Sequence, residues 1–379
     1  MRTLILSCST GEGHNSCAKA IKEIYDANAE YCIIKDVLSF ISDKTVDFFS
    51  KGHAVMYRQI PSLFRFGYRY AEKHPALFLE DAPVYRFLTQ ASDGLFAFLC
   101  SEQIESVICT HVFSSLILTD ILKKYPISLK TCFVATDYTC SPSTRESSLD
   151  YYFIPAPSIA KEYESPNIPS SHIISSGIPV RQEFYLHVPK EKAKVLLQIP
   201  PESKHIVMMC GSMGCGPMKR LTHKLAKFLK NTGYITVICG TNQKLRQELE
   251  EKYKGSRHIR IYGYVHNMSL ILDSADLYLT KPGGISVTEA AIKGIPMVLI
   301  RAVAGCEDYN SLYFVSIGCA QTAAHIGKLT SVCCSVFNDD EHLKYMGSQY
   351  SSFPKQNASQ LIFDIMERQN NYEKYKQHS

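Results

Sequence analysis

The chain has 379 residues, and its 41 lysines and arginines against 36 aspartates and glutamates give a formal net charge of +5 with neutral histidines. A single hydrophobic core stops growing at about 250–300 residues, so this length predicts two domains. Hydrophobic residues make up 45% of the chain and charged residues 20%, as in ordinary globular proteins. The small positive charge argues against a nucleic-acid-binding protein, which would carry a dense basic stripe.

The start of the chain is expected to form a buried strand. Its apolar run from Leu4 to Leu6 is too short for a signal peptide and leads directly into a glycine-rich turn. No stretch approaches the roughly 18–20 apolar residues of a membrane span. Several of the 14 cysteines lie in apolar runs, where a thiol packs as a small hydrophobe, and none has metal-site spacing. We therefore expect a cytoplasmic protein without a metal or other cofactor.

The first half opens with an apolar strand, a glycine-rich turn and an amphipathic helix. The strand is expected at Thr3–Ser9, the turn at Thr10–His14 and the helix from about Asn15 to Asn28. Further strands are expected at Ser106–Thr110, Lys130–Thr136 and Tyr151–Pro155. Such alternation of strands and helices predicts βαβ units and a parallel sheet.

One segment of the first half, residues 39–91, breaks this alternation. It is rich in aromatic residues with basic residues between them, and such a long insertion between strands is often functional. The composition suits the interface of a lipid bilayer. The alternative is a pair of ordinary helices that pack their aromatic side chains into the core, and the two interpretations are compatible.

The second half repeats the opening pattern. A strand is expected at His205–Cys210, a glycine-rich loop at Gly211–Pro217 and a helix from about Met218 to Thr232. Later strands are expected at Tyr234–Gly240, Ile259–Tyr262, Asp276–Thr280 and Pro296–Ile300. The fold class is therefore α/β, with two Rossmann-like, doubly wound parallel-sheet domains at 1–186 and 187–340. Residues 341–379 are expected to form a polar, helical tail.

Two glycine turns in the second half suit a diphosphate. In the first, Gly211, Ser212, Met213 and Gly214 lead a strand into a helix N-terminus, where backbone N–H groups and the helix dipole favour an anion. The loop lacks the P-loop pattern, and a tight turn made only for packing is the alternative.

The second turn contains Pro282, Gly283 and Gly284 and also follows a strand. Glu289, expected in the first helical turn after it, is a candidate ligand for ribose hydroxyls. The competing interpretation is a capping box formed by Ser286 and Glu289.

A polar segment follows the last expected strand of the second half. Glu307 and Asn310 there suit sugar hydroxyls, because ligands of open α/β sheets bind at the carboxyl ends of strands. Taken alone, this segment is more typical of an ordinary polar loop.

The first half contributes candidate bases. Gly11 and Gly13, directly before His14, match the first two glycines of the G-x-G-x-x-G fingerprint, but residue 16 is Ser. Asp36 alone could supply the acidic residue that a dinucleotide site requires. His14 is a candidate general base because histidine titrates near neutral pH. Asp137 is a second candidate, or a partner that orients His14. The alternative is that these residues are polar strand ends without a catalytic role.

Taken together, these motifs resemble the monogalactosyldiacylglycerol synthase and processive diacylglycerol glucosyltransferase family, which is related to the peptidoglycan lipid-intermediate N-acetylglucosaminyltransferase. The resemblance runs in order from residue 1 to about residue 320. It rests on Ser9–Ser16, Thr110–Ser114, Thr136–Tyr138, Gly177–Arg181, Gly211–Gly214, Lys281–Gly284 and Gly305–Glu307.

The resemblance implies a GT-B fold, in which two domains face a central cleft, and a metal-free inverting transfer of a hexose from a UDP-sugar to diacylglycerol. It implies peripheral association with the inner face of the cell membrane. The glycines would hold the diphosphate, Glu289 the ribose, and Glu307 with Asn310 the sugar. The implied donor-binding residues are Gly13, Gly211, Ser212, Met213, Gly214, Gly263, Tyr264, Val265, Pro282, Gly283, Gly284, Glu289, Glu307 and Asn310. His14 would be the base, with Asp137 second.

The chain departs from its relatives in the loop Ser141–Thr144, where many of them carry His or Trp. By similarity this loop faces the acceptor. The alternatives are therefore a different lipid or polyprenyl acceptor and a non-catalytic UDP-sugar-binding protein. A UDP-N-acetylglucosamine 2-epimerase shares the twin-domain layout, but a soluble substrate would not require the aromatic and basic insertion.

Overall fold

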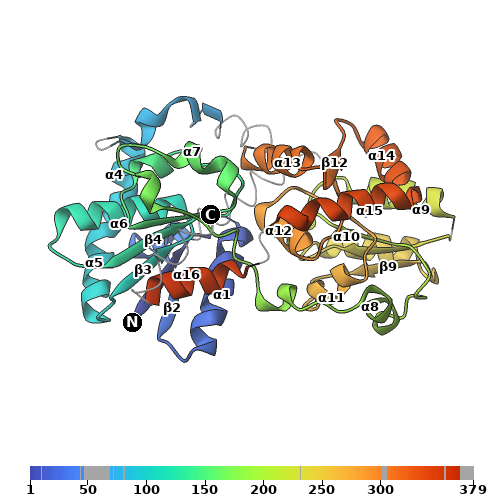
Figure 1. The fold of residues 1–379 in the computed structure, drawn as a ribbon, viewed down its shortest axis with the longest axis horizontal. Coiled ribbons are helices and arrows are strands. Elements are labelled where there is room, and N and C mark those ends of the chain that lie inside the picture. The colour runs from blue at the N-terminus through green and yellow to red at the C-terminus, as the bar shows by residue number, and fades with distance from the viewer. Residues whose placement is uncertain are drawn as a thin grey trace. The chain divides into compact units, whose positions relative to one another are not determined.

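The computed structural model describes residues 1–9, 11–42, 44–46, 69–70, 72–79, 82–230, 232–300, 305–353 and 356–367. The chain divides into two compact units (Figure 1). The N-terminal unit contains Met1–Gln182, Ala304–Cys306 and Pro354–Ser379. The C-terminal unit contains Glu183–Val303 and Glu307–Phe353.

The N-terminal unit is built on a six-stranded sheet of order β2-β1-β3-β4-β5-β6, in which every pairing is parallel. Its strands are β1 (Thr3–Ser7), β2 (Cys32–Asp36), β3 (Ser106–Cys109), β4 (Lys130–Val134), β5 (Tyr151–Ile154) and β6 (Ile173–Ser175). Its helices are α1 (Glu12–Ala27), α4 (Pro83–Leu88), α5 (Ser92–Ser101), α6 (Val112–Lys124), α7 (Ala160–Tyr163) and α16 (Ala358–Glu367). Short 3-10 helices are η1 (Val37–Phe40), η2 (Pro75–Phe78), η3 (Thr89–Ala91), η4 (Thr144–Glu146), η5 (Pro157–Ile159) and η6 (Ser170–His172).

Both faces of this sheet are covered. Leu4 and Leu6 of β1 belong to a core that also contains Leu95 of α5 and Leu116 of α6. Side chains alternate between the faces of a strand, so Ile5 points to the opposite face, and it is fully buried too. Strands buried on both sides read as continuous apolar runs, which explains why β1 was predictable from its sequence.

The C-terminal unit has a second six-stranded parallel sheet, of order β12-β11-β10-β7-β8-β9. Its strands are β7 (His205–Met209), β8 (Tyr234–Ile238), β9 (Ile259–Tyr262), β10 (Leu277–Thr280), β11 (Met297–Leu299) and β12 (Ala320–Thr322). Counted from β7, this is the 3-2-1-4-5-6 order of a dinucleotide-binding fold read from its other edge.

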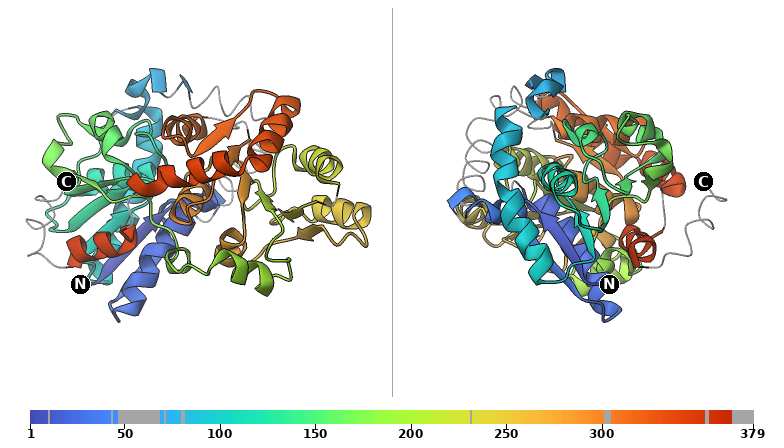
Figure 2. Two further views of the ribbon diagram at one scale, coloured as in Figure 1. Left: turned by 45° about the vertical axis from the view of Figure 1, so that its right-hand side comes forward. Right: turned by 90° about the vertical axis from the view of Figure 1, so that its left-hand side faces the viewer.

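Helices of the C-terminal unit alternate with its strands along the chain as far as β12. Figure 2 gives two further views of the ribbon. The helices are α8 (Lys190–Leu196), α9 (Met218–Leu229), α10 (Gln243–Lys252), α11 (Met268–Asp273), α12 (Gly284–Ile292), α13 (Cys306–Ser316), α14 (Ile326–Asn338) and α15 (Asp340–Ser348), with the 3-10 helices η7 (Gln182–Tyr185) and η8 (Gln349–Ser352). Met208 of β7, Leu225 of α9 and Leu329 of α14 share one core.

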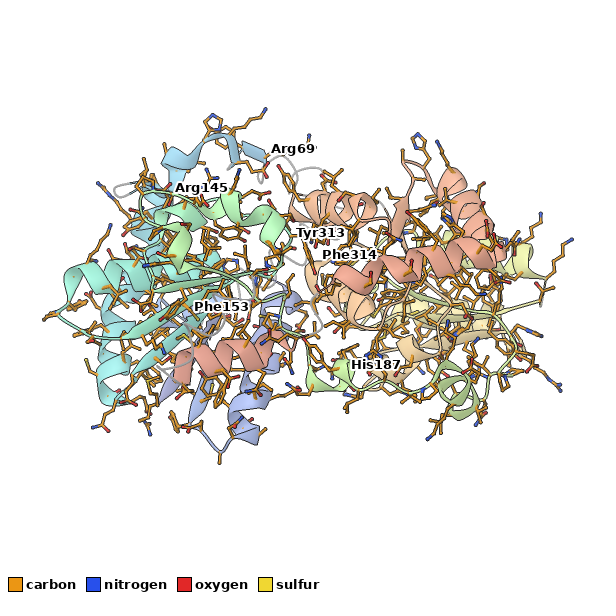
Figure 3. The ribbon with its side chains drawn as sticks, in the orientation of Figure 1. Arg69, Arg145, Phe153, His187, Tyr313 and Phe314 are labelled. Carbon is orange, nitrogen blue, oxygen red and sulfur yellow. The ribbon has the colours of Figure 1, made fainter. Side chains whose placement is uncertain are left out.

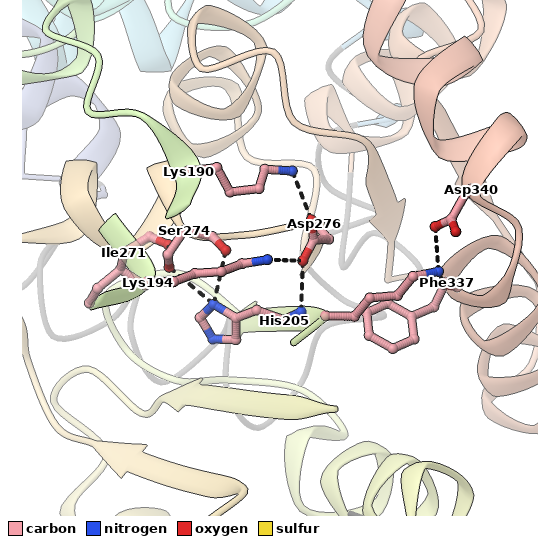
Figure 4. Close-up of polar contacts among 9 residues, drawn as sticks. Lys190, Lys194, His205, Ile271, Ser274, Asp276, Phe337 and Asp340 are labelled. Atoms are coloured by element: carbon pink, nitrogen blue, oxygen red, sulfur yellow. Dashed lines mark hydrogen bonds and ion pairs between the residues drawn. The ribbon is translucent and has the colours of Figure 1, made fainter. Parts of the chain in front are cut away.

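A charged cluster holds α8 against the amino ends of β7 and β10 (Figure 4). The Asp276 carboxylate accepts hydrogen bonds from Lys190 Nζ at 2.8 Å, Lys194 Nζ at 2.9 Å and the backbone N–H of His205 at 2.8 Å. Burial raises the pKa of Asp276, but the two ammonium groups prevail and keep it below its ordinary value. Ligands of open α/β sheets bind at the carboxyl ends of the strands. This cluster lies at the opposite, amino ends.

The segment that follows Gln182 is bound to the C-terminal unit. Ser269 donates its hydroxyl to the Glu183 carbonyl at 2.6 Å, and the buried Lys293 ammonium donates to the Leu186 carbonyl at 2.5 Å. Lys293 also pairs with Asp273 at 2.8 Å. The units therefore divide after residue 182, where the sequence alone had placed the boundary at 186.

The C-terminal region differs from the single polar tail expected at 341–379. Helix α15 belongs to the C-terminal unit, whereas α16 belongs to the N-terminal unit and lies beside α1 (Figures 1 and 2). Leu361, Ile362, Phe363, Ile365 and Met366 of α16 are buried, and the Phe363 ring packs edge-on against Tyr25 at 4.9 Å between centroids. The five apolar side chains lie within six residues, so this part of the tail is an apolar helix and not a polar one.

Much of the aromatic and basic segment 39–91 lies outside the described residues, including Phe48, Phe49, Tyr57, Arg58, Phe64, Arg65, Phe66 and Tyr68. In its described part, Tyr85 and Leu88 of α4 are buried, and the Tyr85 hydroxyl donates to Asp120 at 3.3 Å. This part packs into the core. No helix among the described residues is both long and apolar enough to span a bilayer.

Candidate functional site

The two glycine turns of the C-terminal unit lie next to each other. β7 pairs with β10 in parallel, so the loop after Met209 and the turn after Thr280 leave neighbouring strands at the same edge of the sheet. The chain order reverses between these two strands, and such a switch point is where open α/β sheets bind ligands. The topology therefore brings together two candidate phosphate turns that are about 70 residues apart in sequence.

The first turn has a backbone that only glycine adopts without strain. Gly211, Gly214 and Gly216 have φ of +69°, +54° and +87°. A Cβ on Gly214 would lie 2.1 Å from the Cys239 carbonyl oxygen, so the turn is packed directly on the loop that follows β8. The Thr241 N–H fixes that contact by donating to the Ser212 carbonyl at 2.8 Å.

Lys281 lies against both glycine turns, although the sequence had not indicated it as a donor-binding residue. A Cβ on Gly211 would meet Lys281 Cε at 2.5 Å and Nζ at 3.3 Å, and a Cβ on Gly283 would meet Nζ at 3.8 Å. The Lys281 ammonium pairs with Glu307 Oε1 at 2.9 Å. A cation thus lies at the point where the two turns meet.

Glu307 and Asn310, the two expected sugar ligands, are both buried. Glu307 is 5% exposed in the first turn of α13, and Asn310 is fully buried. The Asn310 amide donates to the Pro282 carbonyl at 3.0 Å. In this structure Asn310 therefore holds the second glycine turn through its hydrogen bond to the Pro282 carbonyl, and Glu307 orients Lys281.

The capping box of Ser286 and Glu289, which was the competing interpretation, is absent. The N-cap of α12 is Gly283, which has no side chain to form a capping hydrogen bond. Ser286 lies inside the first helical turn. Glu289 consequently falls in the second turn, not the first, where it is half-buried. The first N–H groups of α12 lack a side-chain cap, an arrangement that favours an anion at this end of the helix.

The segment expected to contact uracil follows β9. Gly263 is buried and its carbonyl accepts the Gly240 N–H at 3.2 Å, whereas Tyr264 is 63% exposed and Val265 is half-buried. Backbone groups of this segment thus adjoin the same Gly240 turn that supports Ser212.

Two thiols near the first glycine turn are unsuited to covalent catalysis. Burial raises the pKa of Cys239 to about 11, and burial raises the pKa of Cys210 far above its ordinary value. Only the thiolate is a good nucleophile, so neither side chain is reactive near neutral pH.

In the N-terminal unit, His14 lies at the equivalent switch point. The sheet order β2-β1-β3 places the loops after β1 and β3 side by side, and His14 is in the first turn of α1, directly after the first of them. His14 Nδ1 lies 2.8 Å from the Thr110 carbonyl oxygen and 3.1 Å from the Thr136 hydroxyl. The ring of His111 stands edge-on to it, with centroids 4.5 Å apart.

These contacts define the tautomers of both histidines. A carbonyl oxygen can only accept, so His14 Nδ1 carries the proton, and in the neutral ring Nε2 keeps the lone pair. His111 has the opposite arrangement, because its Nδ1 accepts the Phe113 N–H at 3.1 Å as the N-cap of α6. Neutral His14 is therefore oriented as a proton acceptor at Nε2, and neutral His111 as a donor at Nε2.

The other candidate residues of this unit are at neighbouring strand ends. Asp137 is half-buried between the buried Thr136 and Tyr138 after β4. Asp36 ends β2, but its carboxylate accepts the N–H groups of Ser9 at 2.7 Å and Leu38 at 2.9 Å. Asp36 therefore stabilises the local turns, which weakens the dinucleotide interpretation further.

The loop containing Ser141–Thr144 is tied to α7. The Glu162 carboxylate accepts from the Cys140 N–H at 2.9 Å and the Thr139 hydroxyl at 3.1 Å, and Arg145, labelled in Figure 3, donates to the Glu162 carbonyl at 2.6 Å. Ser143 has φ of +69°, unusual for a residue with a side chain. These contacts give the loop a defined conformation.

Two family models match the chain, one in each half. Residues 14–180 match monogalactosyldiacylglycerol (MGDG) synthase, and residues 205–362 match the glycosyltransferase family 28 C-terminal domain. The chain is a glycosyltransferase built from these two domains. Its relatives include the processive diacylglycerol beta-glucosyltransferases of Bacillus cytotoxicus, 25% identical over 97% of this chain and 94% of the relative, and of Staphylococcus epidermidis, 23% identical over 92% and 88%.

Solved structures establish the fold of this glycosyltransferase as GT-B. MurG of Acinetobacter baumannii aligns with a TM-score of 0.65 at 13% identity, covering 97% of this chain and 99% of that one. The spinosyn rhamnosyltransferase SpnG aligns with a TM-score of 0.59 at 10% identity, covering 96% and 100%. A UDP-GlcNAc 2-epimerase from Neisseria meningitidis also aligns, with a TM-score of 0.60 at 13% identity over 97% and 99%. The fold alone therefore does not distinguish transfer from epimerisation.

Proposed function

We propose that this glycosyltransferase transfers a hexose from a UDP-sugar to the hydroxyl of diacylglycerol, with inversion at the anomeric carbon. The observation that carries the proposal is the pairing of an MGDG synthase domain with a family 28 C-terminal domain, in a chain that matches diacylglycerol beta-glucosyltransferases over nearly their whole length. Common UDP-hexose donors are α-linked, so a β product, as in the names of these relatives, requires inversion.

Donor binding is assigned to the switch point of the C-terminal unit. The turns at Gly211–Gly214 and Gly283–Gly284 lead into α9 and α12, neither of which has a side-chain cap, so backbone N–H groups there suit a diphosphate. Glu289 is proposed for the ribose, and the backbone of Gly263–Val265 for the uracil. Helix N-termini also stabilise the negative charge that develops on departing UDP.

Proton transfer is assigned to the N-terminal unit. With Nδ1 donating to Thr110, His14 Nε2 takes the proton from the attacking hydroxyl while the bond between the anomeric carbon and the diphosphate oxygen breaks. Asp137 is the second candidate base. This scheme needs no metal ion.

We further propose that the enzyme acts from the inner face of the cell membrane, to which it binds peripherally. The composition of residues 39–91 and a lipid acceptor support this proposal. Flotation of the purified protein with liposomes, with and without anionic lipid, measures this binding directly. Failure to float in both cases would refute it.

The function is tested by incubating the purified protein with diacylglycerol liposomes and a panel of UDP-sugars, while UDP release and lipid products are followed together. We expect one donor to yield a glycolipid whose anomeric coupling, measured by NMR, identifies the β configuration. An α product would refute inversion. UDP binding without any lipid product would refute diacylglycerol as the acceptor and favour another lipid acceptor or a non-catalytic sensor.

The base is tested with His14→Ala. We expect kcat to fall by about 10²–10⁴ while UDP affinity is retained, since a general base contributes a factor of that order. His172→Ala is the matched control, because His172 Nδ1 also contacts a backbone carbonyl, that of Leu149 at 3.3 Å, but lies at the far edge of the sheet. Undiminished transfer by His14→Ala would exclude this base.

A further inference from the structure

The Lys281–Glu307 ion pair lies at the junction of the two glycine turns. We propose that Lys281 binds the diphosphate of the donor, and that Glu307 is a specificity residue that disfavours UDP relative to UDP-sugar by charge repulsion. This inference rests on the proposed UDP-sugar donor and adds a means by which the site distinguishes substrate from product.

The position of Lys281 supports the first part. Its ammonium is 3.3 Å from the site of a Cβ on Gly211 and 3.8 Å from that on Gly283, so an anion seated on both turns meets Nζ. Its side chain is 21% exposed, and an ammonium offers three donor hydrogens. Lys281 can therefore keep its bond to Glu307 and bind a phosphate oxygen at the same time.

Glu307 is fixed where its charge acts on that phosphate. Glu307 is 5% exposed and lies in the first turn of α13, and its carboxylate pairs with Lys281 at 2.9 Å. The helix N-terminus favours a carboxylate there. Two oxygen anions that share one ammonium are separated by at most about twice a hydrogen-bond length, or roughly 5.8 Å. The bound phosphate and Glu307 therefore repel each other at close range.

The donor and the product differ in charge at this phosphate. In a UDP-sugar the β-phosphate is esterified to the sugar and linked by an anhydride bond to the α-phosphate, so it has one negative charge. In UDP it is terminal and gains a second charge with a pKa of about 6. At roughly 5.8 Å, one additional charge weakens binding by about threefold in water and by about a hundredfold at an effective dielectric constant of 20. The repulsion thus acts mainly on UDP and favours its release.

The experiment compares UDP with its β-methyl ester, which differs from it by this one charge and one methyl group, by isothermal titration of the full chain. In Glu307→Gln we expect both ligands to bind more tightly, with the ratio of their affinities shifting toward UDP by at least about threefold at pH 7.5. At pH 5, where the terminal phosphate of UDP is protonated, we expect the shift to vanish.

Asp308→Asn is the matched control, because it removes the same charge from the next residue of the same helical turn. We expect this variant to retain the wild-type ratio. An unchanged ratio in Glu307→Gln, or an equal shift in Asp308→Asn, would overturn the charge discrimination while leaving the proposed donor intact. Failure of the wild-type chain to bind UDP at all would refute the proposed donor and this inference together.

Lys281 is tested with the double variant Lys281→Met/Glu307→Gln, which removes both charges and leaves no buried carboxylate without its partner. We expect UDP and the methyl ester to lose affinity by at least tenfold while uridine, which has no phosphate, binds as before. Equal losses for all three ligands would mean that the pair only supports the fold. Unchanged binding of UDP would exclude Lys281 as a phosphate ligand. Circular dichroism verifies that each variant is folded.

Discussion

Replacing Gly240 by alanine should disrupt the first glycine turn from outside it. Gly240 has φ of +56°, and a Cβ there would lie 1.9 Å from the Ser212 carbonyl oxygen and 2.7 Å from its carbon. Real Cβ atoms essentially never approach closer than 3.0 Å, so the loops carrying Gly240 and Ser212 must separate by about 1.1 Å. The same movement strains the hydrogen bond from the Thr241 N–H to the Ser212 carbonyl.

The expected cost follows from these contributions. Left-handed backbone costs a residue with a side chain about 1–2 kcal/mol. Overpacking adds about 1–3 kcal/mol, and the lost hydrogen bond about 1 kcal/mol. We therefore expect the free energy of unfolding of the C-terminal unit to fall by about 3–6 kcal/mol. UDP affinity should fall by at least tenfold, because the displaced turn no longer presents its N–H groups to the diphosphate.

Gly216→Ala is the control for this experiment. Gly216 has φ of +87°, but no atom lies within 4 Å of the place that a Cβ would occupy, so only the backbone cost of about 1–2 kcal/mol applies. Urea unfolding followed by circular dichroism measures stability, since the chain has no tryptophan, and titration calorimetry measures UDP binding. Equal losses for the two variants would refute the argument that contact with Ser212 shapes the turn.

Three further predictions concern stability and catalysis. Burial lowers the pKa of His205 from 6.5 to about 4, so as the pH falls the unfolded chain binds the proton before the folded chain does. The free energy of unfolding of the C-terminal unit should therefore have its full value above about pH 6.5 and fall by up to about 3 kcal/mol as the pH drops to 4. Urea unfolding across this range should show that His205→Gln loses the dependence. Phe363→Ala should destabilise the N-terminal unit by about 3–5 kcal/mol through the cavity left against Tyr25, measurable by the same method. Thr136→Val should lower kcat several-fold with little change in KM, because it removes one of the contacts that orient His14. Steady-state assays measure both constants, and a change in KM alone would contradict this role.

Most of the strands that could be predicted have buried, continuous apolar sequence, and the half-exposed edge strand β9 is an exception. β1, β7 and β10 lie inside their sheets and were expected within two residues of their observed bounds. β2, β6 and β12 were not assigned ranges, and all three are edge strands with half-exposed or polar residues. Edge strands bury less surface, so tertiary pairing determines them more than local sequence does.

The candidate site was predictable where backbone conformation requires glycine. Positive φ at Gly211 and Gly214 reflects a local constraint that the sequence displays directly. The Lys281–Glu307 pair and the bond from Asn310 to the Pro282 carbonyl depend on how strands far apart in sequence are ordered. A residue pattern alone could identify Glu307 and Asn310 as polar, but not that both are buried and engaged with the second turn.

The return of α16 to the N-terminal unit has a consequence for biosynthesis. Thr3 donates its hydroxyl to Glu367 at 3.0 Å, so the first strand and the last described helix complete one core. About 185 residues separate Gln182 from Glu367, and at roughly 5–20 residues per second a ribosome needs about 10–40 seconds to supply them. During that interval the C-terminal unit, which is complete by Phe353, can fold first. The N-terminal unit meanwhile exposes the apolar surface of α1 that α16 later covers, so nascent chains are open to chaperones and to aggregation on that side.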